Sequence, residues 1–215
     1  MLAENERRKR LYSCKYDRIT GDPSSFVIPR FEITIDDTRF YLPKEMECEP
    51  IICVLKQYGS WIKVIEEIKR ANNDHTPVTH EEIIATILDF SKIREKYDFE
   101  FYTATNIKIQ EKNKKRLIPF VQNHGQLKLL KELEKMRLEG VPIRVIIVKA
   151  RQWGGSTLIQ IYMLWLQLLH YENWHSTIVA KDKTQASNIR NMLSRAVDNF
   201  PAEMGRYELA SMPLS

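Results

Sequence analysis

The sequence has few cysteines, which stabilise small secreted domains as disulfides, and no apolar run of the length that spans a membrane. It contains three cysteines in 215 residues, an odd number without metal-ligand spacing. The first ten residues lack the apolar stretch of a secretory signal, so we expect reduced thiols rather than disulfides or zinc. The longest apolar run, Leu158–Leu169, contains two glutamines and is too short to cross a bilayer. No membrane partner is therefore expected.

The charge balance is mildly basic. The formal net charge is +5 and the isoelectric point about 9.0. Basic clusters occur at Arg7–Arg10 and at Lys112–Arg116. Because phosphate neutralisation dominates nucleic-acid affinity, this favours a polyanionic partner. Each cluster taken singly is equally compatible with a solvated basic surface.

One stretch of the chain is typical of a strand, a phosphate-binding loop and a helix. Val145–Val148 is continuously apolar and β-branched, as in a strand buried on both faces of a parallel sheet. Gly154 and Gly155 allow backbone N–H groups to turn toward an anion. Ser156 then opens a helix whose N-terminal dipole favours the same anion, and its hydroxyl is placed to ligate Mg²⁺.

The match to the phosphate-loop pattern G-x-x-x-x-G-K-[ST] is partial. Gly154 and Ser156 align with the second glycine and the hydroxyl residue, whereas Gly155 stands at the lysine position. Lys149 stands where the first glycine belongs, and we expect it to supply the missing ammonium from the front of the loop. Arg151 is a second cation able to reach a γ-phosphate. The alternative is an ordinary strand–turn–helix connection of an α/β protein.

The flanking residues extend this unit. A helix is predicted from about His124 to Glu139, with a stop at Gly140. Gln126 has two competing interpretations: a capping box with Asn123, or a hydrogen bond to an adenine edge. Downstream, Ser176–Ala180 predicts a second buried strand, and Thr184 is expected to cap the next amphipathic helix.

These residues resemble the large terminase subunits of tailed bacteriophages, the ATPases that pump DNA into capsids. The resemblance covers about Leu117 to Phe200, and an Arg-Gln-x-Gly loop followed by a hydroxyl residue is its most specific part. The residues that carry it are Pro119, Phe120, Gln126, Lys149 to Thr157, Ile178 to Ala180, Gln185 and Ala186.

The resemblance implies a site for ATP and Mg²⁺, with Gln126 near the base and Arg151 stabilising charge at the transferred phosphoryl group. The implied catalytic residues are Lys149 and Arg151. The implied cofactor-binding residues are Gln126, Gln152, Trp153, Gly154, Gly155, Ser156 and Thr157, with Ser156 on the metal. It also implies duplex DNA as partner, a homo-oligomeric ring on a portal, a small terminase subunit and a location in the host cell cytoplasm.

The expected fold class is α/β. Residues 1–115 are predicted to form a small α+β region, and residues 116–215 the first part of a P-loop NTPase-type domain with an incomplete parallel sheet. No strand ending in Asp-Glu follows the loop, and Asp182 is a poor substitute. No nuclease-type aspartate cluster is present either. We therefore expect an N-terminal fragment that binds nucleotide weakly and does not turn it over.

Two other functions remain open. One is a helicase-like nucleic-acid ATPase, which further downstream sequence would distinguish. The other is a non-catalytic adaptor or DNA-binding module, which equilibrium binding of an ATP analogue with Mg²⁺ would distinguish.

In the N-terminal region, Phe31–Leu42 predicts a β-hairpin with its turn at Asp36-Asp37, and Thr79 with Glu82 predicts a capping box. The aromatic patch at Phe99–Tyr102 is expected to be core rather than a platform for stacking bases.

Overall fold

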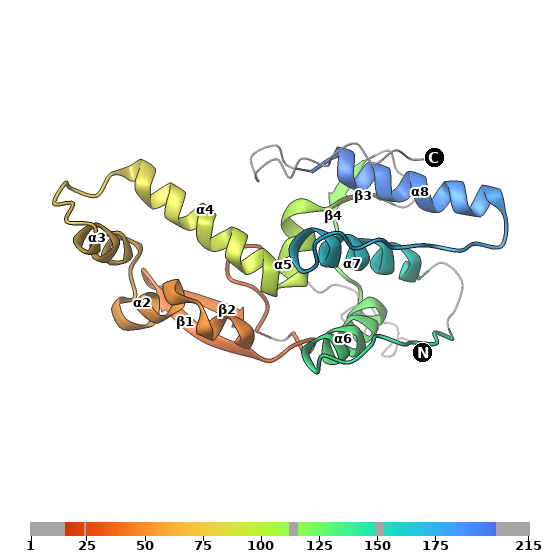
Figure 1. Cartoon of the computed structure of the whole chain (residues 1–215), viewed down its shortest axis with the longest axis horizontal. Coiled ribbons are helices and arrows are strands. Elements are labelled where there is room, and N and C mark those ends of the chain that lie inside the picture. The colour runs from red at the N-terminus through yellow and green to blue at the C-terminus, as the bar shows by residue number, and fades with distance from the viewer. Residues whose placement is uncertain (1–15, 24, 112–115, 149–152, 201–215) are drawn as a thin grey trace, which may run out of the picture.

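The computed structural model describes residues 16–23, 25–111, 116–148 and 153–200. Over these residues it contains seven α-helices, one 3-10 helix and four short strands. The strands form two separate antiparallel pairs. Figure 1 shows an elongated arrangement, with the first pair and α2–α4 at one end and α6–α8 at the other. The predicted α/β class is confirmed at this level.

The first pair of strands is the predicted hairpin. β1 (Arg30–Ile35) pairs with β2 (Thr38–Pro43), and Ile35 lies opposite Thr38. Asp36 and Asp37 form the two-residue turn with φ of 43° and 64°. Two successive left-handed residues match the right-handed twist of a hairpin, and aspartate tolerates this conformation better than most residues.

Four helical elements complete the N-terminal end of the molecule. They are η1 (Lys44–Cys48), α2 (Pro50–Tyr58), α3 (Trp61–Ala71) and α4 (His80–Tyr97). The capping box predicted at the start of α4 is confirmed. Their apolar faces and the hairpin enclose one core, whose buried members are Ile33, Ile35, Phe40, Leu42, Met46, Ile52, Leu55, Trp61, Val64 and Phe90.

A second core lies at the other end of the chain. It is enclosed by α5 (Phe99–Asn106), α6 (His124–Leu138), α7 (Gly155–Leu169) and α8 (Lys183–Asp198), with the small sheet of β3 (Lys108–Gln110) and β4 (Leu117–Pro119) beside it. The aromatic patch forms α5. Its Phe99 ring packs on both Tyr162 and Trp165 at centroid distances of 5.3 and 5.4 Å. The core interpretation of the patch is therefore confirmed.

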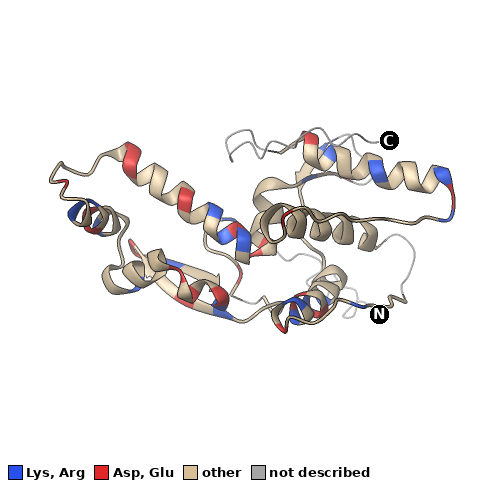
Figure 2. Cartoon of the chain, in the orientation of Figure 1, with Lys and Arg blue, Asp and Glu red and all other residues tan. Residues whose placement is uncertain are grey.

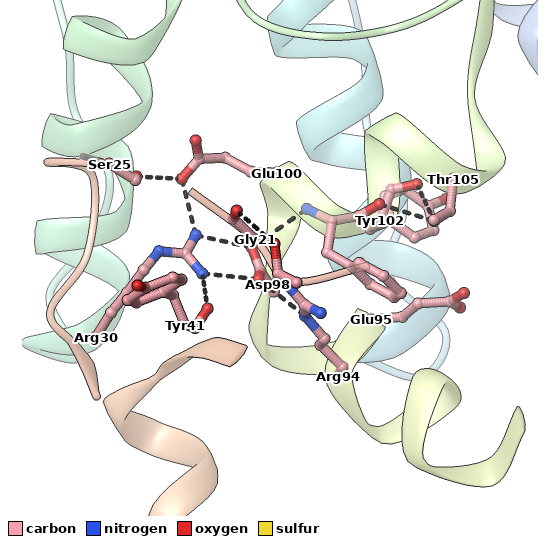
Figure 3. A network of polar contacts seen from close by, with 12 residues as sticks. Gly21, Ser25, Arg30, Tyr41, Arg94, Glu95, Asp98, Glu100, Tyr102 and Thr105 are labelled. Carbon is pink, nitrogen blue, oxygen red and sulfur yellow. Dashed lines mark hydrogen bonds and ion pairs between the residues drawn. The ribbon is translucent and has the colours of Figure 1, made fainter. Parts of the chain in front are cut away.

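Buried charges join the two ends of the molecule where α4 meets α5 (Figure 3). The Arg30 guanidinium donates to the Asp98 carboxylate at 2.8 and 3.0 Å and to Glu100 at 2.9 Å. Arg94 approaches the same Asp98 carboxylate at 3.3 Å. Burial alone would raise the pKa of Asp98, but the two guanidiniums hold it at about 2. These four side chains fix the start of β1 against the α4–α5 junction.

The first core takes its residues from Ile33 to Phe90, and the second from Val27 and Ile28 and from Phe99 onward, whereas the predicted domain boundary lies at residues 115 and 116. The division into residues 1–115 and residues 116–215 therefore stays a prediction. Cys48 and Cys53 are free and exposed. In the described part of the chain, no helix is both long and apolar enough to span a membrane.

The two predicted parallel strands are absent. Val145–Val148 and Ser176–Ala180 contain no strand residues, and the described residues form no parallel sheet. Ile146 is 96% exposed, Val148 98% and Val179 90%. The structure therefore does not confirm the buried-strand interpretation, because among the described residues these segments pair with no strand edge.

Candidate nucleotide-binding loop

The proposed phosphate loop lies directly before α7 (Figure 1). The four residues Lys149, Ala150, Arg151 and Gln152 lie outside the described residues, so the predicted cations of the loop cannot be placed. Trp153, Gly154, Gly155, Ser156 and Thr157 are all described. The structure therefore gives the rear half of the loop and the start of the helix.

The first turn of α7 presents backbone donors to an anion. Gly154 is its N-cap residue with φ 85° and ψ 13°, a left-handed conformation that glycine adopts without strain. No described side chain caps this helix, and the first backbone bond runs from the Leu158 N–H to the Gly154 carbonyl at 3.2 Å. The N–H groups of the first turn therefore have no partner within the helix, and the helix dipole adds partial positive charge there.

Gln126 holds this turn in place from another helix. Its side-chain Oε1 accepts from the backbone N–H of Asn123 at 2.9 Å, and its Nε2 donates to the Gly154 carbonyl at 2.9 Å. The Asn123 side chain in turn accepts from the Gln126 N–H at 3.0 Å. The capping-box interpretation is thus confirmed. Gln126 is only 4% exposed, and both its polar atoms are engaged, so a bond to an adenine edge stays a prediction that this arrangement does not favour.

The start of α6 and the start of α7 meet at the loop. Asn123, the N-cap of α6, donates through Nδ2 to the Trp153 carbonyl at 3.2 Å. Together with the bond from Gln126, this places the N-terminus of α6 against residues 153 and 154, where α7 begins. Each terminus carries about half a positive charge, so their convergence creates a positive potential suited to an anion.

Two glycines allow this close packing. A Cβ at Gly154 would lie 2.7 Å from the Gln126 Nε2 atom, and one at Gly155 would lie 2.5 Å from the Trp153 indole. The indole itself lies over Gly155, and its buried Nε1 has no hydrogen-bond partner among the described residues. A buried donor without a partner costs roughly 1–3 kcal/mol, which makes it a candidate ligand contact.

The two hydroxyl residues point in different directions. Ser156 is exposed, which suits a residue that must reach a solvated metal ion or a phosphate. Thr157 is half-buried and lines a hollow of about 330 Å³ between α7, α8 and β3. Because neighbouring helix residues are about 100° apart, both hydroxyls cannot face the loop. The nucleotide contact of Thr157, predicted together with that of Ser156, stays a prediction.

No preformed metal site accompanies the loop. Over the described ranges, no cluster of three or more His, Cys, Asp or Glu side chains could hold a metal ion. Asp182, the only acidic candidate considered from the sequence, accepts from the Gln185 N–H at 2.8 Å and caps α8. The prediction that Thr184 caps this helix is therefore wrong, because the helix starts one residue earlier, at Lys183, and the Asp182 carboxylate caps it.

Sequence reasoning found Gln126, Gly154, Gly155 and Ser156 but missed the role of Asn123 toward the loop. The sequence did contain a feature that could have predicted this contact, because a capping-box asparagine keeps a side-chain N–H₂ group for a second partner. Comparisons of the chain with protein-family models, with curated proteins and with solved structures give no match, so the site must be interpreted from its own geometry.

Proposed function

We propose that this chain is the ATP-binding part of a DNA-packaging motor of the terminase type. The loop from Lys149 to Thr157 would hold the phosphates of Mg-ATP. The observation that carries the proposal is the contact of the α6 N-terminus with residues 153 and 154, where α7 begins. An uncapped α7 and an exposed Ser156 support it, because a phosphate needs accessible donors.

Residue roles follow from this placement. The amide of Ser156 would contact a phosphate oxygen and its hydroxyl would reach Mg²⁺, whereas Gly155, buried beside the Trp153 indole, would shape the turn. Lys149 and Arg151 would add the cations that the second half of the loop lacks. Gln126 would act by positioning Gly154, which differs from the base contact that the resemblance implies.

The same proposal includes the parallel sheet of a P-loop NTPase-type domain. Ile143–Val148 and Ser176–Ala180 are the β-branched segments that would form its strands on either side of α7. Their exposed apolar side chains are the observation in favour, because a soluble monomer rarely leaves such a run uncovered. A ring of identical subunits on a portal, with a small terminase subunit and in the host cell cytoplasm, belongs to the proposal as well.

Equilibrium titration with a fluorescent, non-hydrolysable ATP analogue, with and without Mg²⁺, tests the function. We expect saturable binding that weakens about tenfold or more in the Lys149→Ala variant, because loss of a charged phosphate contact costs roughly 1.5–3 kcal/mol. Lys63→Ala removes the same charge from the exposed face of α3, remote from the loop, and should bind as the wild type does. Equal binding by Lys149→Ala and wild type would refute the loop assignment, and absence of all binding would favour the non-catalytic adaptor.

A further inference from the structure

Helix α4 exposes apolar side chains along part of its surface. It has 18 residues, and Figure 1 shows it along the edge of the N-terminal end of the molecule. Its buried side chains all lie in its second half, from Phe90 onward. In the first half, Ile84 is 46% exposed, Ile87 37% and Leu88 43%. Large apolar side chains that gather on one surface mark a contact site, whereas single ones need no explanation.

Two of these apolar side chains lie on a stripe that has a charge at each end. Successive helix residues are about 100° apart, so Glu81, Ile84, Leu88 and Lys92 fall within an arc of about 80°. All four side chains are exposed. The stripe therefore has a carboxylate toward the N-terminus of the helix, an apolar centre and an ammonium toward the C-terminus.

The charges of α4 are divided along its length. Figure 2 shows acidic side chains at the start of the helix and basic side chains toward its end. Glu82 pairs with Lys69 at 2.7 Å, but Glu81 makes no ion pair with a described residue. Lys92 has one partner, the exposed carboxylate of Asp89 at 3.0 Å. Exposed pairs of this kind add little stability, so Lys92 remains able to meet a second carboxylate.

The stripe is complementary to itself when its direction is reversed. If two copies of α4 pack antiparallel with their midpoints at residue 86, Ile84 lies opposite Leu88 of the second copy. Glu81 then lies within about 1.5 Å, measured along the axis, of the level of Lys92 of the second copy. A two-fold axis repeats both contacts, so the interface has one apolar centre and two opposite-charge pairs. A parallel arrangement in register would place like charges together.

An apolar hollow of about 420 Å³ lies beside the stripe. Leu88 and Ile87 form part of its wall, together with the aromatic side chains of Trp61 and Phe90. Its other lining residues are Arg18, Ile19, Phe40, Ser91, Arg94, Phe101, Thr105 and Asn106. In the antiparallel arrangement Ile84 of the second copy packs on Leu88, at the edge of this hollow. The second copy would thus add apolar cover to the hollow as well as to the stripe.

We propose that the stripe of Glu81, Ile84, Leu88 and Lys92 binds the same stripe of a second copy of this chain in an antiparallel, two-fold dimer. The order of its charges selects this occupant, because the reversed stripe matches itself. A contact between two single helices is smaller than the roughly 1,200–2,000 Å² of a stable complex, so we expect a dissociation constant on the order of 10–100 µM. The dimer does not rest on the proposed function, since it needs neither nucleotide nor a ring.

Sedimentation equilibrium of the whole chain without nucleotide, from about 5 to about 500 µM, tests the dimer over the expected range of dissociation constants. The weight-average mass should rise from 25.4 kDa toward twice that value. Ile84→Lys should weaken dimerisation about tenfold or more, because it places a charge in the apolar centre. The matched control is Ile62→Lys on α3, the same substitution at an isoleucine that is also 46% exposed, and it should dimerise as the wild type does.

Exchange of the two charges tests which residues meet. Glu81→Lys and Lys92→Glu should each weaken the dimer about three- to tenfold, because each places two like-charge pairs in the interface. The double variant Glu81→Lys/Lys92→Glu should recover the wild-type affinity to within about twofold, an outcome that damage to the fold would not produce. A mass that stays at 25.4 kDa over the whole range would overturn the proposal. An equal loss in Ile62→Lys, or a double variant as weak as the single ones, would overturn it too.

Discussion

The side-chain Nε2 of Gln126 donates a hydrogen bond to the Gly154 carbonyl at 2.9 Å and thereby connects α6 to the turn that opens α7. The same side chain closes the capping box of α6 through its Oε1 atom. One amide therefore stabilises the starts of two helices. Different substitutions of Gln126 should therefore separate its effect on helix capping from its effect on the position of the loop.

We expect Gln126→Glu to keep the capping box, because a carboxylate accepts from the Asn123 N–H as the amide does. It loses the donor to Gly154 and adds a negative charge beside the loop, so affinity for the ATP analogue should fall by about tenfold or more. Gln126→Ala should lose both contacts and about 1–2 kcal/mol of unfolding free energy in urea. A Gln126→Glu protein that binds the analogue as wild type does would contradict a positioning role.

Gly154→Ala should destabilise the protein more than Gly140→Ala. Both glycines have positive φ, 85° and 66°, so alanine is strained by about 1 kcal/mol at either position. A Cβ at Gly154 also meets Gln126 Nε2 at 2.7 Å, whereas nothing lies within 4 Å of one at Gly140. The difference between the two variants, roughly 1–3 kcal/mol by urea unfolding, measures the crowding alone.

The double variant Gly154→Ala/Gln126→Ala provides the internal check on this contact. Removing the Gln126 amide should abolish the excess cost of Gly154→Ala, and a thermodynamic cycle reports the coupling. Strictly additive costs would mean that the turn is not restrained by Gln126.

Asp98→Asn should be among the most destabilising single substitutions. Asp98 is fully buried between Arg30 and Arg94, and removal of its charge takes away the carboxylate that Arg94 pairs with and leaves Arg30 with Glu100 alone. Breaking such a buried pair costs roughly 3–5 kcal/mol. The exposed pair between Arg39 and Glu32 serves as a control, because Glu32→Gln should cost less than about 1 kcal/mol.

The Asp98 carboxylate should also make the protein less stable in acid. The pKa of Asp98 falls from 3.8 to about 2 on folding, so its contribution is complete above pH 3.8 and disappears as the pH falls through 2. Urea unfolding between pH 5 and pH 2 should show this loss in the wild type. The difference between wild type and Asp98→Asn should shrink over the same interval; a constant difference would exclude an ionised Asp98.

The buried Glu95 side chain should change the free energy of unfolding with pH in the opposite direction. Burial raises its pKa from 4.5 to about 7, although a contact with Asn106 lowers the value in part. Its Oε1 has no hydrogen-bond partner among the described residues. A raised pKa means that the folded state holds a proton that the unfolded state has released, so stability falls as the pH rises from 4.5 to 7.

Glu95→Gln should remove this dependence. Relative to wild type, the variant should gain stability on the order of 3 kcal/mol between pH 4.5 and pH 8, measured by chemical unfolding at each pH. Glu81, an exposed residue in the first turn of α4, gives the control Glu81→Gln, whose difference from wild type should stay nearly constant. If the difference in unfolding free energy between Glu95→Gln and wild type also stayed constant with pH, the Glu95 carboxyl would be solvated in the folded state.

The sequence alone determined the local elements. The hairpin turn at Asp36-Asp37, the capping boxes at Thr79 and Asn123 and the helix stop at Gly140 all depend on interactions within a few residues, and all of them are present. Neighbouring residues determine local hydrogen bonds and backbone preferences, so short sequence patterns predict them well. The loop glycines and Ser156 were found in the same way.

Only the tertiary structure decided what depends on distant partners. A β-branched segment becomes a buried strand only if another strand and an apolar cover meet it, and among the described residues no strand pairs with Val145–Val148. The second contact of Gln126 also depends on a distant partner, because its Nε2 donates to the carbonyl of Gly154, 28 residues away. The pairing of Arg30 with Asp98 joins residues 68 positions apart, a relationship that no local pattern contains.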